Sequence, residues 1–172
     1  MTKCLNNPTW NVIYTCPKTE KKVHNSLTKL NVDSYLPLQK VVRQWSDRKK
    51  KIEVPMFPNY VFVKVDLTEH WKVLSVNGVV RFINFAGILS KVPDYEIDMI
   101  KRILQDEHIT VAKENCCFEV GRKIRIAKGR FTGLVGTLIE KRGKFRLLVR
   151  IESISQSIAI DIPTDCIEDI FV

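Results

Sequence analysis

The hydrophobic pattern of the chain changes at residues 106–117, and this change constrains the fold more than any other feature. Before it, short alternating stretches are interleaved with stretches whose apolar residues recur at helical spacing. From Phe118 onward the sequence has the pattern of short strands separated by turns. The intervening DEHITVAKENCC is polar and has no strong period, which is typical of a flexible linker. We therefore predict two domains, at residues 8–105 and 118–172, joined by a linker at 106–117.

The first predicted domain mixes strands and helices. TWNVIYT at 9–15 alternates as a strand does, and the segment at 18–30 spaces Val23, Leu27 and Leu30 along one helical face. Extended segments at 32–45 and 52–66 are joined by a charged turn, SDRKKK. Helices are expected at 68–76 and 92–105, with a strand at 78–87 between them. This order predicts an α+β fold in which helices flank an antiparallel sheet.

The second predicted domain contains only strands. Its strand-like segments are KIRIA, GTLIEKR, FRLLVRI, SIAIDIP and CIEDIFV. Several short strands within so few residues predict a small β-barrel. The Val and Ile content of FRLLVRI and SIAIDI favours a stable β structure.

Charge points to a polyanionic partner. The chain has 28 Lys and Arg against 19 Asp and Glu, a net charge of +9. Residues 1–105 carry 17 of these cations and 9 of the anions, a balance of +8. Such an excess favours nucleic acid as a partner, the alternative being a basic protein tuned for solubility.

The residue types that could support catalysis or bind a metal do not cluster in the sequence. His24, His70 and His108 are isolated, and GRFTGLVG lacks the spacing of a dinucleotide loop. The cysteines are odd in number and form no CxxC pair: Cys4, Cys16, Cys116, Cys117 and Cys166. We therefore expect free thiols, no metal, no cofactor and no enzymatic activity.

No apolar run approaches the ~20 residues that span a bilayer, and MTKCLNNPTW has no apolar signal region. We therefore expect a soluble, cytoplasmic monomer with no membrane association.

An aromatic segment is the strongest candidate for a binding surface. In YVFVKV, alternation places Tyr60 and Phe62 on one face of a strand and Val61, Val63 and Val65 on the other. If the valines face the helices and this strand pairs with residues 9–15, the aromatics lie beside Trp10 and Tyr14. An exposed aromatic patch would mark a protein-binding site, and burial in the core is an equal alternative. The neighbouring RKKK run is either a solvated turn or a set of phosphate contacts.

The order of these motifs resembles the NusG family of transcription elongation factors. The likeness is carried by WNVIYT, EKKV, YLP, FPNYVFV and GVVRFINFAG, and after the linker by VGRKIRIAKGRFTGLVGTLIEKRGKFRLLVRI. It covers roughly residues 8–170 and includes a NusG N-terminal domain and a KOW domain. WSDRKKK followed by PMFPNYVFV is similar to the specialised RfaH and UpxY group, whose UpxY members act on capsular-polysaccharide operons.

The resemblance implies that the N-terminal domain bridges the cleft of RNA polymerase and suppresses pausing or termination on selected operons. A pocket would bind the β′ clamp helices through Trp10, Tyr14, Phe57, Pro58, Tyr60 and Phe62. The β gate loop would contact Glu69, His70, Trp71 and Lys72, where the threonines of RfaH-like proteins are missing. The non-template DNA strand or nascent RNA would contact Lys21, Lys22, Lys29 and Arg81, with a second group at Arg43, Arg48, Lys49, Lys50 and Lys51.

The resemblance also implies a five-stranded, SH3-like KOW barrel that recruits ribosomal protein S10 or the Rho factor. Its motif residues are Gly121, Ile124, Ile126, Gly129, Phe131, Gly133 and Gly136. Two other functions stay open at this point. One is a general NusG that couples polymerase to Rho or to the ribosome, and the other is a ribosome- or RNA-binding KOW protein.

Overall fold

The computed structural model describes residues 7–44, 49–85, 87–105, 123–126, 132–141, 144–161 and 167–169. The chain divides into two compact units, Met1–Ile97 and Asp98–Val172, which are described separately below. The predicted linker at 106–117 lies outside the described residues, so the predicted domain boundary stays a prediction.

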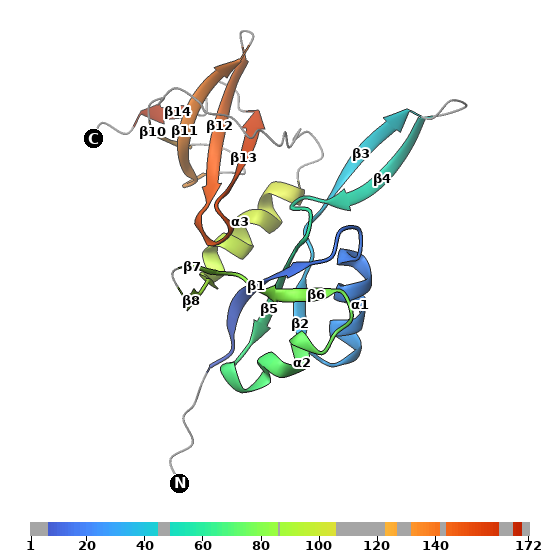
Figure 1. Ribbon diagram of the computed structural model, residues 1–172. Coiled ribbons are helices and arrows are strands. Elements are labelled where there is room, and N and C mark those ends of the chain that lie inside the picture. Colours follow the sequence, from blue (N-terminus) through green and yellow to red (C-terminus); the bar gives the residue numbers. More distant parts are fainter. Residues whose placement is uncertain are drawn as a thin grey trace. The chain divides into compact units, whose positions relative to one another are not determined.

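The first unit mixes helices and strands in the order shown in Figure 1. Its elements are β1 (Thr9–Thr15), α1 (Glu20–Lys29), β2 (Asp33–Tyr35), β3 (Leu38–Gln44), β4 (Lys49–Pro55), β5 (Tyr60–Val65), the 3-10 turn η1 (Leu67–Glu69), α2 (His70–Leu74), β6 (Val79–Phe82), β7 (Asn84–Phe85), β8 (Ile88–Leu89) and β9 (Lys91–Val92). The helix α3 (Asp94–Gln105) begins in this unit, and its residues from Asp98 onward belong to the second unit.

The elements expected from the sequence are present, with several differences. The segment predicted as one extended stretch at 52–66 is β4 and β5, which belong to different sheets, and the strand predicted at 78–87 is β6 and β7. Lys49, Lys50 and Lys51 were predicted within a charged turn, but they begin β4 because they pair with residues 42–44 of β3. The extended segment predicted at 32–45 is two strands, β2 and β3, separated at Leu36 and Pro37. Pro37 has no N–H to donate, and its carbonyl accepts a 2.8 Å bond from the N–H of Met56. The helix predicted at 68–76 is the 3-10 turn η1 followed by the short α2.

Strand β1 lies at the centre of an antiparallel sheet. The strands are ordered β2-β5-β1-β6, and β9 also pairs with β1. In the β1–β5 ladder Tyr14 lies opposite Tyr60 and Val12 lies opposite Phe62. The expected pairing of the two aromatic strands is therefore confirmed.

One face of this sheet carries the hydrophobic core. Val61, Val63 and Val65 of β5 cluster with Val23 and Leu27 of α1 and with apolar residues of α2 and β6. The valines face the helices, as the alternation predicts. Burial of these side chains, at roughly 25 cal/mol per Å² of apolar surface, is what holds α1 against the sheet.

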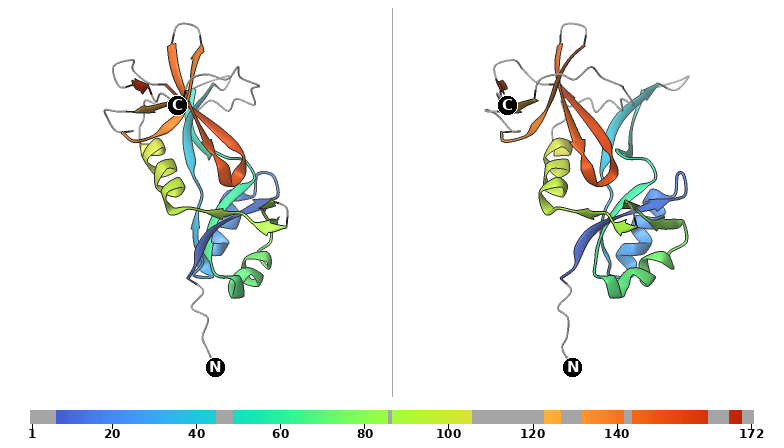
Figure 2. Two further views of the ribbon diagram at one scale, coloured as in Figure 1. Left: turned by 90° about the vertical axis from the view of Figure 1, so that its left-hand side faces the viewer. Right: turned by 60° about the vertical axis from the view of Figure 1, so that its left-hand side comes forward.

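Strands β3 and β4 form a separate two-stranded sheet. It extends as a ribbon away from the main sheet of the first unit (Figures 1 and 2). In its ladder Val41 lies opposite Ile52, Val42 opposite Lys51 and Arg43 opposite Lys50. We call residues 38–44 and 49–55 the basic ribbon.

The second unit contains a five-stranded antiparallel sheet in the order β13-β12-β11-β10-β14. The strands are β10 (Lys123–Ile126), β11 (Val135–Lys141), β12 (Lys144–Ile151), β13 (Gln156–Asp161) and β14 (Ile167–Asp169), with a 3-10 turn η2 (Glu152–Ile154) after β12. In β10 the alternation buries Ile124 and Ile126 and exposes Lys123 and Arg125. The predicted closure of this sheet into a barrel stays a prediction.

Two of the predicted KOW glycines have visible backbone roles. Gly133 has φ of +89° in the turn before β11, a conformation that favours glycine. A Cβ on Gly136 would lie 2.6 Å from the carbonyl oxygen of Leu148 and 2.8 Å from Cδ1 of Leu147. Gly136 therefore allows β11 to approach β12 closely. Gly121, Gly129 and Phe131 lie outside the described residues.

Candidate functional site

The face of the sheet opposite the valine core carries aromatic side chains. The rings of Tyr14 and Tyr60 meet edge to face at 5.6 Å, and Phe62 lies 6.2 Å from Phe57 and 6.3 Å from Tyr35 between ring centroids. We call Trp10, Tyr14, Tyr35, Phe57, Tyr60 and Phe62 the aromatic cluster. Because β1 and β5 pair in this register, alternation in each strand brings its residues together.

Burial divides the aromatic cluster into an inner and an outer part. Phe62 is 0% exposed and Phe57 is 4% exposed, so both side chains have a packing role. Trp10, Tyr14 and Tyr60 are half-buried, and Pro58 is exposed. Phe57 and Phe62 therefore follow the core alternative, whereas for Trp10, Tyr14 and Tyr60 a binding surface stays a prediction.

Tyr35 was not predicted as part of the site. It belongs to β2, where it lies opposite Phe62 of β5. Burial raises the pKa of the Tyr35 phenol to about 12, so its hydroxyl stays protonated at neutral pH. The position of Tyr35 in the cluster could not be predicted from local sequence, because β2 is only three residues long and its pairing with β5 is a tertiary contact.

Two cations border the aromatic cluster. The Nζ of Lys64 lies 5.8 Å from the ring centroid of Trp10 and 3.8 Å from a carboxylate oxygen of Asp94. Arg81, which is exposed, lies opposite Tyr14 in the β1–β6 ladder. The site therefore combines apolar rings with positive charge at its border, an arrangement that suits a protein surface with apolar and acidic groups.

The segment predicted to contact the gate loop has an inward and an outward part. The His70 ring stacks on Phe82 at 4.3 Å, and burial lowers the pKa of this imidazole. Trp71 is 66% exposed. Glu69 and Lys72 form a 2.6 Å salt bridge across one helical turn. Of the predicted group, Trp71 thus presents a large apolar side chain to solvent, whereas His70 packs against the core.

The carboxylate of Asp66 caps the start of η1. It accepts bonds from the backbone N–H groups of Thr68 at 2.6 Å and Glu69 at 3.1 Å, and from the Thr68 hydroxyl. The hydroxyl bond is the main cause that lowers the pKa of Asp66. This cap fixes where the short helix begins.

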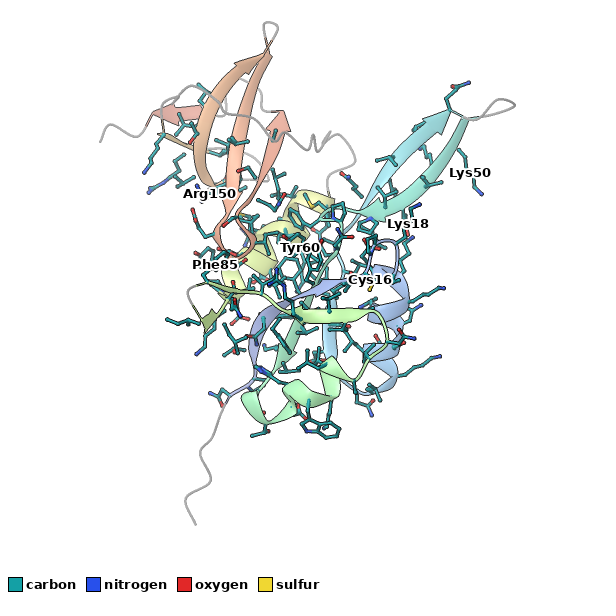
Figure 3. All side chains as sticks on the ribbon, in the orientation of Figure 1. Cys16, Lys18, Lys50, Tyr60, Phe85 and Arg150 are labelled. Atoms are coloured by element: carbon teal, nitrogen blue, oxygen red, sulfur yellow. The ribbon has the colours of Figure 1, made fainter. Side chains whose placement is uncertain are left out.

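The predicted nucleic-acid contacts lie on α1, on the basic ribbon and, for Arg81, on β6 of the first unit. Lys21, Lys22 and Lys29 are exposed on α1, and Lys50 and Lys51 are exposed on the basic ribbon. Figure 3 labels Lys50 on the ribbon and Lys18 in the loop before α1. Arg43 and Lys49 belong to β3 and β4, but their side chains, and all of Arg48, lie outside the described part of the chain.

In the described ranges, no helix is both long and apolar enough to span a membrane. Among the same residues, no group of three or more His, Cys, Asp or Glu is placed to hold a metal ion.

Comparisons with known proteins agree on one family. Residues 8–101 match the family model described as transcription termination factor nusG. The transcription termination/antitermination protein NusG of Staphylococcus carnosus is 30% identical, over 92% of this chain and 94% of the relative. The NusG of Chlamydia pneumoniae is 28% identical, over 83% of this chain and 85% of the relative.

The fold is shared with a solved structure of Thermotoga maritima NusG. The TM-score is 0.59 at 23% identity, and the match covers 95% of this chain and 97% of the other. The family model covers more than half of the 172 residues, and the relative from Staphylococcus carnosus matches nearly the whole chain. The chain therefore belongs to the NusG family of transcription termination and antitermination factors.

Proposed function

We propose that this protein binds elongating RNA polymerase across its cleft and suppresses pausing or termination on selected operons, of the capsular or surface polysaccharide type. The observation that carries this proposal is the aromatic cluster, in which the half-buried rings of Tyr14 and Tyr60 pair beside the cations Lys64 and Arg81. Half-buried tyrosine and tryptophan side chains at a charged border are common in protein-binding sites.

The aromatic cluster would bind the β′ clamp helices while the segment at 69–72, through Trp71, contacts the β gate loop. A factor that binds the closed clamp more tightly than the swivelled one shifts the population towards the closed state. The polymerase remains the only enzyme in this mechanism. The protein contributes binding free energy and supplies no catalytic group.

The cations on α1 and the basic ribbon would contact the non-template DNA strand or nascent RNA. Lysine contacts to phosphates supply affinity that falls with salt and carry little sequence information. The second unit would form the KOW barrel and recruit ribosomal protein S10 or Rho.

The test is transcription of a pause-bearing template by purified polymerase, with variants of the outer aromatic residues. Tyr14→Ala and Tyr60→Ala should each weaken binding by about thirtyfold, the size expected for an interface hot spot of ~2 kcal/mol. Phe62→Ala is less informative, because Phe62 is fully buried and its truncation would destabilise the fold by about 3–5 kcal/mol.

Phe85→Ala is the matched control, since Phe85 is an exposed aromatic on the separate β7–β8 hairpin. If the Tyr14 and Tyr60 variants both suppress pausing as well as the wild type does, the proposed polymerase-binding site is wrong.

A general NusG that acts on most genes is the second candidate. The observation that favours it is that the relatives from Staphylococcus carnosus and Chlamydia pneumoniae are both named NusG. Genome-wide occupancy separates the two functions. Signal confined to a few operons supports the specialised factor, and signal on most transcribed genes supports the general one.

A further inference from the structure

Asn59, the residue immediately before β5, is fixed by three hydrogen bonds. Its backbone N–H donates to Oε1 of Glu20 at 2.9 Å, its carbonyl accepts from the N–H of Thr15 at 2.8 Å, and its side-chain amide donates to the Tyr14 hydroxyl at 3.3 Å. Its φ of +69° is unusual for a residue other than glycine. These bonds hold an otherwise disfavoured turn directly beside Tyr60.

Glu20 is the buried carboxylate of this group. The residue is 5% exposed, and it is the first residue of α1, where the helix N-terminus favours negative charge. A buried carboxylate without a hydrogen-bond donor would destabilise the fold. The bond from the Asn59 N–H therefore stabilises both the Glu20 carboxylate and the turn at Asn59. Glu20 therefore ties the start of α1 to the turn that positions Tyr14 and Tyr60.

The next residue of α1 is bonded to the basic ribbon. The Nζ of Lys21 donates to the backbone carbonyl of Glu53 in β4 at 2.9 Å. Glu53 and Asn59 are the two ends of the segment EVPMFPN, which leads from the ribbon to the aromatic strand β5. Adjacent residues of one helix thus hold both ends of the connection between the two candidate contact surfaces.

We propose that Glu20 and Lys21 are positioning residues that set the direction of the basic ribbon relative to the aromatic cluster. The inference rests on the proposed function in one respect, namely that the two surfaces contact one polymerase–nucleic-acid complex at the same time. A ribbon held in one direction would then bind with less loss of conformational entropy than a loose one.

The test of Glu20 is hydrogen exchange and side-chain NMR of the full chain. Glu20→Leu removes the acceptor at similar volume, and it should speed exchange of the Asn59 amide by about tenfold or more. The NMR signals of the Tyr14 and Tyr60 rings should shift in the same variant. Glu20→Gln keeps an acceptor oxygen and should restore most of the protection and of the polymerase affinity.

If Glu20→Leu does not fold, Glu20→Asp shortens the side chain, so its carboxylate should no longer reach the Asn59 N–H, and exchange of that amide should again speed up. Unchanged Asn59 exchange in a folded Glu20→Leu or Glu20→Asp protein would overturn the role assigned to Glu20.

The role of Lys21 is tested by comparing Lys21→Ala with Lys22→Ala, because each variant removes one positive charge from the same helix. Backbone order parameters of residues 40–42 and 51–53 should fall in Lys21→Ala and match the wild type in Lys22→Ala. The affinity for a polymerase–DNA complex should fall further in Lys21→Ala than in Lys22→Ala. Equal order parameters in the two variants would overturn the assignment.

The NMR measurements do not depend on what the protein binds. If they change as expected while Tyr60→Ala binds polymerase normally, the positioning role is supported and the proposed function fails.

Discussion

At the scale of single residues, two glycines of the second unit have different requirements. Gly133 has a positive φ, and among the described residues no atom lies within 4 Å of a Cβ at this position, whereas a Cβ on Gly136 would face backbone and side-chain atoms at 2.6–2.8 Å. We therefore expect Gly133→Asn to be tolerated better than Gly133→Ala, because Asn adopts the left-handed region more readily. Gly136→Ala and Gly136→Asn should both destabilise by about 1–3 kcal/mol. Denaturant unfolding checks this, and a stable Gly136→Asn protein would contradict it.

His70 gives a second prediction at this scale. Its pKa is lowered by burial against Phe82, and its Nε2 is buried with no hydrogen-bond partner among the described residues. Below the ordinary pKa of ~6.5 the unfolded chain binds a proton that the folded one resists. Stability should therefore be complete above pH ~6.5 and fall as the pH drops below it.

The measurement is the free energy of unfolding from pH 5 to 7. His70→Phe should reduce this pH dependence, and the remainder should come from His24, whose pKa burial also lowers. Asp66 does not contribute to the change in unfolding free energy between pH 5 and 7. Its pKa is lowered, so its effect on that free energy lies below pH ~3.8. An unchanged slope in His70→Phe would show that His70 titrates normally in the folded protein.

At the scale of elements, the basic ribbon gives a prediction about salt. If Lys50 and Lys51 contact phosphates, Lys50→Ala with Lys51→Ala should flatten the plot of log K against log salt by about 1.8 for duplex DNA or 1.4 for a single strand. Lys91→Ala with Lys123→Ala removes the same charge elsewhere and should leave the slope nearly unchanged. Fluorescence anisotropy over a salt series measures both. Equal slopes in all proteins would show that Lys50 and Lys51 are solvated residues of the ribbon that make no phosphate contact.

Helices and strands whose position depends on local residue spacing were predicted well. Features that depend on tertiary packing partners were predicted poorly. Val23 and Leu27 mark α1 by their spacing, and both are fully buried. In α3 the sequence indicated Ile97, Ile100 and Leu104, whereas the fully buried set includes Ile103 and Leu104 is half-buried. Either stripe has helical spacing, so only the packing of the helix chooses between them.

The contacts of the candidate site show the same limit. Alternation in β1 and β5 was enough to predict that Tyr14 and Tyr60 lie on one face. Tyr35 and Glu20 could not be found in this way, because each reaches the site through a partner distant in sequence, Phe62 and Asn59 respectively. Alternation and spacing are properties of local sequence, and these contacts are properties of the folded sheet.

At the scale of the whole molecule, the second unit should keep its β structure when separated from the first. Its five described strands bury their own apolar residues, among them Ile124, Leu147, Val149, Ile158 and Ile160. Circular dichroism of an isolated 112–172 fragment should therefore show β structure and one cooperative unfolding transition. A helical spectrum would contradict this prediction and point to a unit that changes its fold.

The basic ribbon also has a consequence for solubility. Within the described residues β3 and β4 pair only with each other, so each has one strand edge whose N–H and C=O groups could pair with another chain. Val42, at 60% exposure, adds an apolar side chain to this ribbon. Lysines on exposed strands oppose such edge-to-edge association by charge repulsion. Lys40, Lys50 and Lys51 would therefore protect the protein from self-aggregation at high concentration, independently of any anion that they bind during function.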